Sequence, residues 1–298
     1  MLMITKRPRS RQMDPRDKIF LAFEGIKTEP QYFDGLLEKE EKNINVTIIP
    51  LHRGPGREGS SNPQKIVSMV HDYQKWLCDD ILSVDLFVEL VLYDAYRKTK
   101  NEFLGEKFNE LKHAVTHTQY TDGGRTTITD KNGALKVCEK IIKGASIPSR
   151  AIPGGPPQDP KFFIIVDRDP KSFTAEQCDN VKKRCEECGF SLIVSNPCFE
   201  IWLLLHSDVG KEEIIRHATP KLLKELHKRV TGEDGNLNFN YYHRKIDHAM
   251  QRLRTEGYCE NMNGLLSEPN PDGSADENSI GTNIGELMGI IFEKRYPK

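Results

Sequence analysis

Four short apolar runs stand out in an otherwise polar chain. They are Lys18–Phe23, Val46–Ile49, Phe162–Val166 and Phe190–Val194. Each is too short for a confident helix, and a continuous apolar run of this length is typical of a strand buried on both faces of a parallel sheet. The hydrophobic pattern therefore predicts four buried strands.

The segments after these runs have apolar residues at helical spacing. Thr28 to about Glu41 places Tyr32 and Phe33 on one face, with Thr28 as the expected N-cap. Pro63 to about Leu77 and Thr174 to Cys188 show similar spacing. Strands that alternate with helices form parallel sheets, so the fold class expected is α/β.

The alternation is interrupted between residues 79 and 159. We interpret this stretch as an inserted, mainly helical accessory lobe and expect that it contacts a partner or the substrate. It separates the two parts of the core, and the rest of the chain forms a terminal tail and a helical C-terminal region. The predicted boundaries are 1–17 for a basic flexible tail, 18–78 and 160–208 for the core, 79–159 for the lobe and 209–298 for the C-terminal region.

Overall composition narrows the class of protein only a little. The 298 residues include 43 Lys and Arg against 44 Asp and Glu, so net charge gives no sign of a nucleic-acid or membrane partner. The seven cysteines are scattered, and no apolar run approaches the roughly 18 residues that span a bilayer. We therefore expect a cytoplasmic protein without a membrane partner.

Three acidic residues follow two of the predicted strands. Glu24 comes directly after the first apolar run, and Asp167 and Asp169 come directly after the third. In open α/β sheets, ligands bind outside the carboxyl ends of the strands. We therefore expect these three carboxylates to converge in one cleft.

Clustered carboxylates at neutral pH call for a cation. Hard oxygen ligands favour Mg²⁺ or Mn²⁺, which commonly bridge carboxylates to a substrate phosphate. Such a site suits phosphodiester cleavage. The alternative interpretation is that these acids cap strands and helices, where backbone N–H groups satisfy them.

Three sequence blocks resemble one protein family. They are Glu24-Gly-Ile-Lys-Thr-Glu29, Val166-Asp-Arg-Asp169 and Ser195-Asn-Pro-Cys-Phe-Glu-Ile-Trp-Leu-Leu204. Their order, and the ending at Gly281–Leu287, resemble the RloB-like family. The stretch from 79 to 160 departs from it, because it is much longer than the link expected there.

The resemblance implies a Toprim-like, Rossmann-like core similar to that of the overcoming-lysogenisation-defect nucleases. It implies an effector of phage defence and abortive infection, encoded beside an ATPase of the ABC or AAA type. It assigns Glu24 as metal ligand or general acid/base, and Asp167 and Asp169 as the metal-binding pair. Glu200 is a further candidate ligand, with capping of the following helix as its alternative. Related nucleases often have a second acid at the position that Thr28 occupies in this chain. Glu29 is the next residue here, so the number of bound metal ions stays open.

Several basic residues are candidates for contact with nucleic-acid phosphate. They are Lys27, with a solvated side chain as the alternative, Arg53 and Arg57 after the second strand, with a mobile loop as the alternative, and Arg168. The segment Gly54–Gly59 matches the dinucleotide fingerprint formally, but it contains a proline and follows the second strand, so we discount it. No phosphate-binding G-x-x-x-x-G-K-[ST] motif occurs, so a partner would have to supply ATPase activity.

The sequence leaves more than one function open. A metal-dependent nuclease is the leading hypothesis, and the alternative is a non-catalytic subunit that binds nucleic acid or the ATPase. A topoisomerase or primase-like transferase ranks last, because no tyrosine-nucleophile domain or primer-synthesis apparatus is recognisable. The choice between DNA and RNA, including transfer RNA, and the formation of a homo-oligomer are also undetermined.

Overall fold

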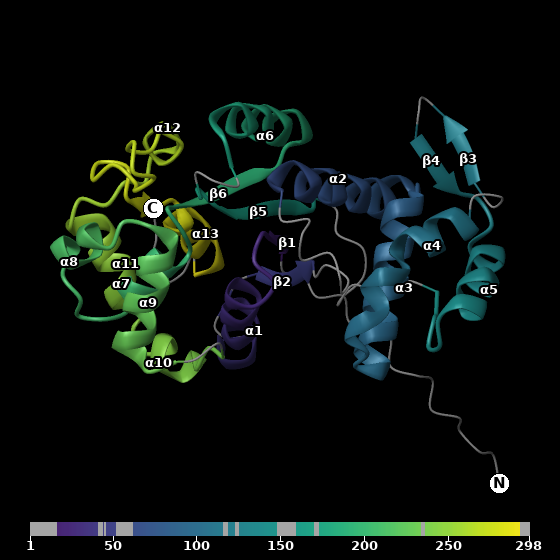
Figure 1. Cartoon of the computed structure of the whole chain (residues 1–298), viewed down its shortest axis with the longest axis horizontal. Coiled ribbons are helices and arrows are strands. Elements are labelled where there is room, and N and C mark those ends of the chain that lie inside the picture. Colours follow the sequence, from purple (N-terminus) through teal and green to yellow (C-terminus); the bar gives the residue numbers. More distant parts are fainter. Residues whose placement is uncertain are drawn as a thin grey trace, which may run out of the picture.

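A five-stranded sheet forms the centre of the molecule in the computed structural model (Figure 1). The structure describes residues 17–40, 44, 46–51, 62–115, 119–122, 125–147, 159–169, 173–233 and 236–292. The strand order is β2-β1-β5-β6-β7; the first four strands are mutually parallel and β7 is antiparallel to β6. The strands are β1 (Asp17–Phe23), β2 (Val46–Leu51), β5 (Lys161–Asp167), β6 (Ser191–Asn196) and β7 (Gly281–Thr282).

Alternate residues of each strand enter two separate hydrophobic cores. In β1, Ile19 and Leu21 face one core and Phe20 and Ala22 face the other. This alternation is the period of two expected of a strand, and burial on both sides explains the continuous apolar runs. The predicted α/β class, with a mostly parallel sheet flanked by helices, is confirmed.

Helices cover both faces of the sheet. The first face packs against α1 (Thr28–Glu40), α7 (Glu200–Leu205) and helices of the C-terminal region, and the second against α2 (Pro63–Asp79) and α6 (Ala175–Cys188). Capping side chains mark the residues at which α2 and α6 begin. The Asn62 side chain accepts the Gln64 N–H at the start of α2, and Thr174 with Gln177 forms a capping box at α6.

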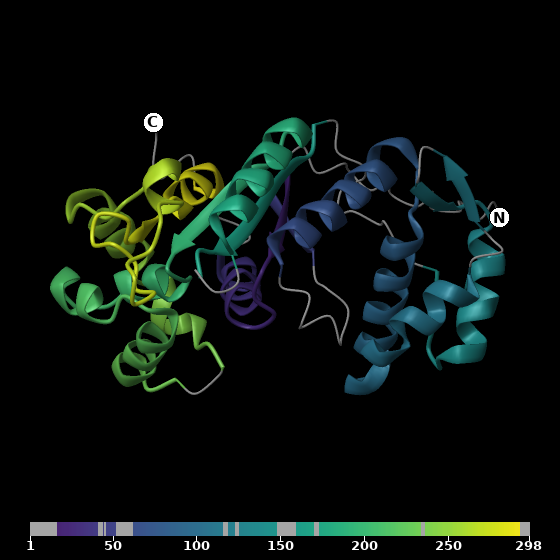
Figure 2. The same cartoon turned by 45° about the horizontal axis from the view of Figure 1, so that its top comes forward.

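Residues 79–159 contribute no strand to the five-stranded sheet in the part of this segment that the structure describes. Their elements gather beyond α2, at the end of the molecule opposite the C-terminal helices (Figures 1 and 2). The segment also includes an antiparallel hairpin, which the expectation of a mainly helical insertion did not include. The elements are α3 (Val84–Thr99), η2 (Glu102–Lys107), α4 (Phe108–Ala114), β3 (Gln119–Asp122), β4 (Arg125–Ile128) and α5 (Lys131–Ile141).

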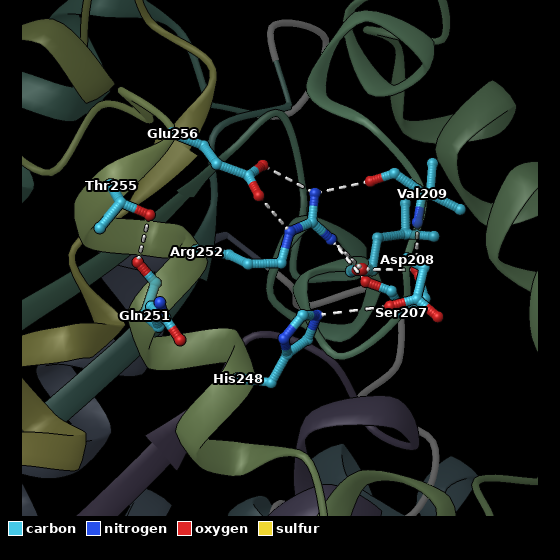
Figure 3. A network of polar contacts seen from close by, with 9 residues as sticks. Ser207, Asp208, Val209, His248, Gln251, Arg252, Thr255 and Glu256 are labelled. Carbon is cyan, nitrogen blue, oxygen red and sulfur yellow. Dashed lines mark hydrogen bonds and ion pairs between the residues drawn. The ribbon is translucent and has the colours of Figure 1, made fainter.

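The C-terminal region is helical, as expected, and adds the edge strand β7. A buried arginine ties this region together: Arg252 donates to the carbonyls of Ser207 and Val209 at 2.6 Å each and pairs with Glu256 (Figure 3). Among the described residues, none of the helices has both the length and the apolar character needed to cross a membrane. The helices are α8 (Lys211–Arg216), α9 (Pro220–Thr231), α10 (Phe239–His243), α11 (Ile246–Thr255), α12 (Met262–Leu265) and α13 (Ile284–Ile291).

Candidate functional site

The candidate site lies where the direction of the sheet reverses. From β1 the chain crosses to β2 on one side, and from β5 it crosses to β6 on the other, while β1 and β5 are neighbours. The crevice at the carboxyl ends of such neighbouring strands is the usual ligand site of open α/β sheets. Glu24 follows β1 here and its N–H donates to Ile165 of β5 at 2.9 Å, while Asp167 ends β5.

Backbone amides hold the first two carboxylates in place. The Asp167 N–H donates to Glu24 Oε2 at 2.9 Å, and Asp167 Oδ1 accepts the N–H of Phe199 at 2.8 Å. Phe199 directly precedes α7, so this second bond ties the end of β5 to the segment that carries Glu200. The structure therefore brings the first and third sequence blocks to the second.

A third carboxylate, Glu29, reaches the same place from the first turn of α1. Glu29 is buried, and its Oε1 accepts the Gly25 N–H at 3.0 Å. A side chain at Gly25 would collide with this carboxylate, since an added Cβ would lie 2.0 Å from Glu29 Oε2. Glycine after Glu24 therefore makes room for a second acid in the Glu24–Glu29 block.

Glu200 completes the group as the first residue of α7. It is buried, and its Oε2 has no hydrogen-bond partner among the described residues. Burial, followed by the charges of Glu29, Glu200 and Glu24, raises the pKa of Asp167 well above its usual value. Burial and then the charge of Glu200 raise the pKa of Glu29. Four acids thus share one electrostatic environment, called here the acidic cluster: Glu24, Glu29, Asp167 and Glu200.

Lys224 of α9 supplies positive charge to the acidic cluster. Burial opposes protonation of this lysine, but the neighbouring carboxyl groups, Glu200 first and then Asp167 and Glu29, outweigh that effect and raise its pKa. Lys224 therefore stays charged at neutral pH. Cys198 is fully buried, and burial, together with Glu200 and Asp167, raises its pKa well above the usual value, which disfavours a thiolate.

The remaining sequence candidates lie in different surroundings. Asp169 is half-buried two residues beyond Asp167 and is not among the acids with the largest effect on the Asp167 pKa, so its metal-binding role stays a prediction. Arg168 is buried and donates to the carbonyls of Phe173 and Ser267. This position ties together two loops and gives no support to the expected phosphate contact. Lys27 is exposed, whereas Arg53 and Arg57 lie outside the described residues.

The chemistry of the acidic cluster fits a hard divalent cation. Its donors are carboxylate oxygens, and Glu200 Oε2 is a buried acceptor that lacks a partner within the described part of the chain. No group of three or more His, Cys, Asp and Glu side chains in that same part is already arranged to hold a metal ion. Several carboxylate oxygens are instead bonded to backbone N–H groups, so metal binding would require side chains to shift.

Two members of this site were not predicted from the sequence as functional residues. Glu29 was noted only as a neighbour of Thr28, and the signal that could have identified it is the glycine at position 25 within the same turn. Lys224 lies in a polar helix 200 residues beyond Glu24, and no local pattern distinguishes it from other lysines of α9. Only the packing of α9 against α7 brings it to the acidic cluster.

The fold and the acidic cluster define the class as an α/β protein with a Rossmann-like sheet and a largely buried group of carboxylates where the direction of the sheet reverses. The family model described as RloB-like protein matches residues 19–290, and the chain belongs to this family. The match includes every member of the acidic cluster and Lys224. Comparison with curated proteins and with solved structures returned no match.

Proposed function

We propose that this chain is a metal-dependent phosphodiesterase that cleaves nucleic acid, the Toprim-type activity that its sequence resemblance implies. The observation that carries the proposal is the pairing of Glu24 and Asp167 through the 2.9 Å hydrogen bond from the Asp167 N–H, beside the buried carboxylate of Glu200. These oxygens adjoin the crevice where α/β folds bind ligands. The proposed function follows from the ability of clustered carboxylate oxygens to bind a divalent cation.

Glu24, Asp167 and Glu200 would hold Mg²⁺ or Mn²⁺, with Asp169 as a further predicted ligand. When bound, the cation would neutralise phosphate charge and activate water for attack on the phosphodiester. The protein itself contributes orientation. Hydrogen bonds from backbone N–H groups to Glu24 Oε2 and Asp167 Oδ1 orient these two carboxylates. Lys224 adds a positive charge at the edge of the acidic cluster.

The biological setting is also proposed from the resemblance. An ATPase of the ABC or AAA type, encoded nearby, would control this activity, and the pair would act in phage defence by abortive infection. The sequence has no G-x-x-x-x-G-K-[ST] motif, so such a partner would supply any ATP-dependent step. The exposed Lys27 remains a candidate for phosphate contact.

The test is cleavage by the purified chain, alone and together with its ATPase. DNA and RNA pools would be incubated with Mg²⁺, with Mn²⁺ or with EDTA, and the products separated by size. We expect cleavage that EDTA abolishes, and its preference for one pool identifies the substrate. Cleavage that persists in EDTA would contradict the metal-dependent mechanism.

A non-catalytic subunit is the second candidate. The observation that favours it is the lack of a preformed metal-binding group among the described residues. In that case the acidic cluster would be structural, with its carboxylates accepting backbone N–H groups as they do at Glu24 and Asp167. Binding of nucleic acid or of the ATPase without cleavage under any cation condition would favour this alternative.

A further inference from the structure

A cavity of about 190 Å³ adjoins the acidic cluster on the α9 side. Glu200 belongs to both, because it lines the cavity and also acts on the pKa of Asp167. Thr28 and Gln31 of α1 line one wall, and residues of α9 line another. The Oε2 atom of Glu200 is buried and lacks a hydrogen-bond partner among the described residues. Glu200 therefore presents an unused acceptor where the cavity and the acidic cluster meet.

Two lysines bring positive charge to this cavity, whose lining also includes Glu200 and Glu233. Lys224 and Lys228 both line it and are four residues apart on α9, so they lie on the same face of the helix. A pair of ammonium groups is suited to phosphate oxygens. The charge of Lys224 is secured by the neighbouring carboxylates, which raise its pKa.

Glu233, the second acid of the cavity lining, already accepts two hydrogen bonds. Glu233 accepts the Asn238 N–H at one oxygen and the Tyr242 hydroxyl at the other, each at 2.6 Å. His227 lies 2.7 Å from the same hydroxyl through its Nε2. These bonds hold Glu233 in place. Gln31 accepts the Leu237 N–H at its Oε1, and its NH₂ group has no hydrogen-bond acceptor within the described part of the chain.

We propose that this cavity binds one unstacked nucleotide of a single-stranded nucleic acid, with Lys224 and Lys228 contacting its phosphate. The inference rests on the proposed function, and it places the nucleotide next to the phosphodiester that the acidic cluster acts on. The volume is below the ~300–1,000 Å³ of pockets for drug-sized ligands, so no more than one nucleotide unit of a strand can enter the cavity. A base enters such a space only when it has left its stack, which costs least in a single strand.

Binding by a cleavage-deficient protein tests this inference. The full chain with Asp167→Asn would be titrated with labelled single-stranded DNA, single-stranded RNA and the matching duplexes at several salt concentrations. We expect a single strand to bind more tightly than its duplex. Adding Lys224→Met or Lys228→Met should weaken single-strand binding about three- to tenfold and reduce the salt slope by about 1.

The matched control is Lys221→Met, which removes a lysine of the same helix outside the cavity lining. It should change affinity by less than twofold. Equal effects at Lys221 and Lys228, unchanged binding in both cavity variants, or tighter binding of the duplex would each overturn the inference. A free mononucleotide that binds as tightly as the strand would also overturn it.

Cleavage by the wild-type chain separates this inference from the proposed function. If the wild type cleaves nucleic acid while Lys224→Met and Lys228→Met leave strand binding intact, the cavity assignment fails and the nuclease stands. If the wild type neither cleaves nor binds any nucleic acid, both fail. Loss of strand binding in the cavity variants with no change at Lys221 supports the cavity.

Discussion

The main-chain N–H of Asp167 donates a hydrogen bond of 2.9 Å to Glu24 Oε2, across the junction of β1 and β5. These residues are 143 positions apart in the sequence. The bond fixes the orientation of the Glu24 side chain at the end of β5. The Asp167 carboxylate accepts the Phe199 N–H through its Oδ1. Each carboxylate is therefore oriented by the backbone of the next segment, so alanine at either position would remove a support of the fold as well as a charge.

Gly25→Ala should displace Glu29. The added Cβ would lie 2.0 Å from Glu29 Oε2, so the carboxylate must move and the bond from the Gly25 N–H is strained or lost. We expect a loss of about 1–3 kcal/mol in the free energy of unfolding, measured by urea titration. Gly289→Ala in α13 is the control, because among the described residues no atom outside its own helix backbone and chain neighbours lies within 4 Å of the added Cβ. It should be neutral or slightly stabilising. Equal losses in both variants would contradict the close packing described here.

Arg252→Met should destabilise the C-terminal region. The guanidinium is buried and serves the carbonyls of Ser207 and Val209 together with the Glu256 carboxylate (Figure 3). Removing it leaves these acceptors without their donor, at a cost of about 3–5 kcal/mol in urea unfolding. Arg216→Met breaks an exposed pair with Glu213 and should cost less than about 1 kcal/mol. Similar costs for the two variants would mean that burial of Arg252 has no energetic role.

His206 should make the protein sensitive to acid. This ring is fully buried, and burial lowers its pKa from 6.5 to about 3, so it stays neutral in the fold while the unfolded chain takes up a proton below pH 6.5. Stability is therefore present above pH 6.5 and is lost as pH falls towards 3. Between pH 7 and 5 the loss from this group is about 2 kcal/mol. Unfolding of His206→Gln should show a correspondingly smaller loss, and an equal loss would assign the acid sensitivity elsewhere.

Much of the sheet could be predicted because burial on both faces produces continuous apolar runs, as in Phe162–Val166. The hairpin of β3 and β4 was missed, since its strands have only four residues each and are mostly polar. The edge strand β7 has two residues, too few for any periodicity. Hydrophobic patterns over a few residues do not predict such short strands.

The candidate site likewise contains residues that local sequence patterns predict and residues that they do not. Glu24 and Asp167 were predicted because each follows a recognisable strand, and the sheet order then places them side by side. Lys224 was missed because its position depends on how α9 packs against α7. Residues that reach a site through tertiary packing of a helix have no local signature in one sequence.

Glu24→Gln and Asp167→Asn test the central claim, that the paired carboxylates carry out metal-dependent cleavage. Both substitutions keep an oxygen that can accept the backbone N–H groups now bonded to Glu24 Oε2 and Asp167 Oδ1, while each removes a negative charge. The melting temperature without divalent cation should therefore stay unchanged or rise, because repulsion within the acidic cluster falls. Asp179→Asn, at an exposed position of α6, is the matched control.

The deciding measurement is the rate of nucleic-acid cleavage in Mg²⁺ or Mn²⁺ by these three variants and the wild type, with a thermal melt of each preparation. We predict that Glu24→Gln and Asp167→Asn each lower the rate at least about 100-fold with an unchanged or higher melting temperature, while Asp179→Asn cleaves like the wild type. Folded Glu24→Gln and Asp167→Asn proteins that cleave at the wild-type rate would contradict the account.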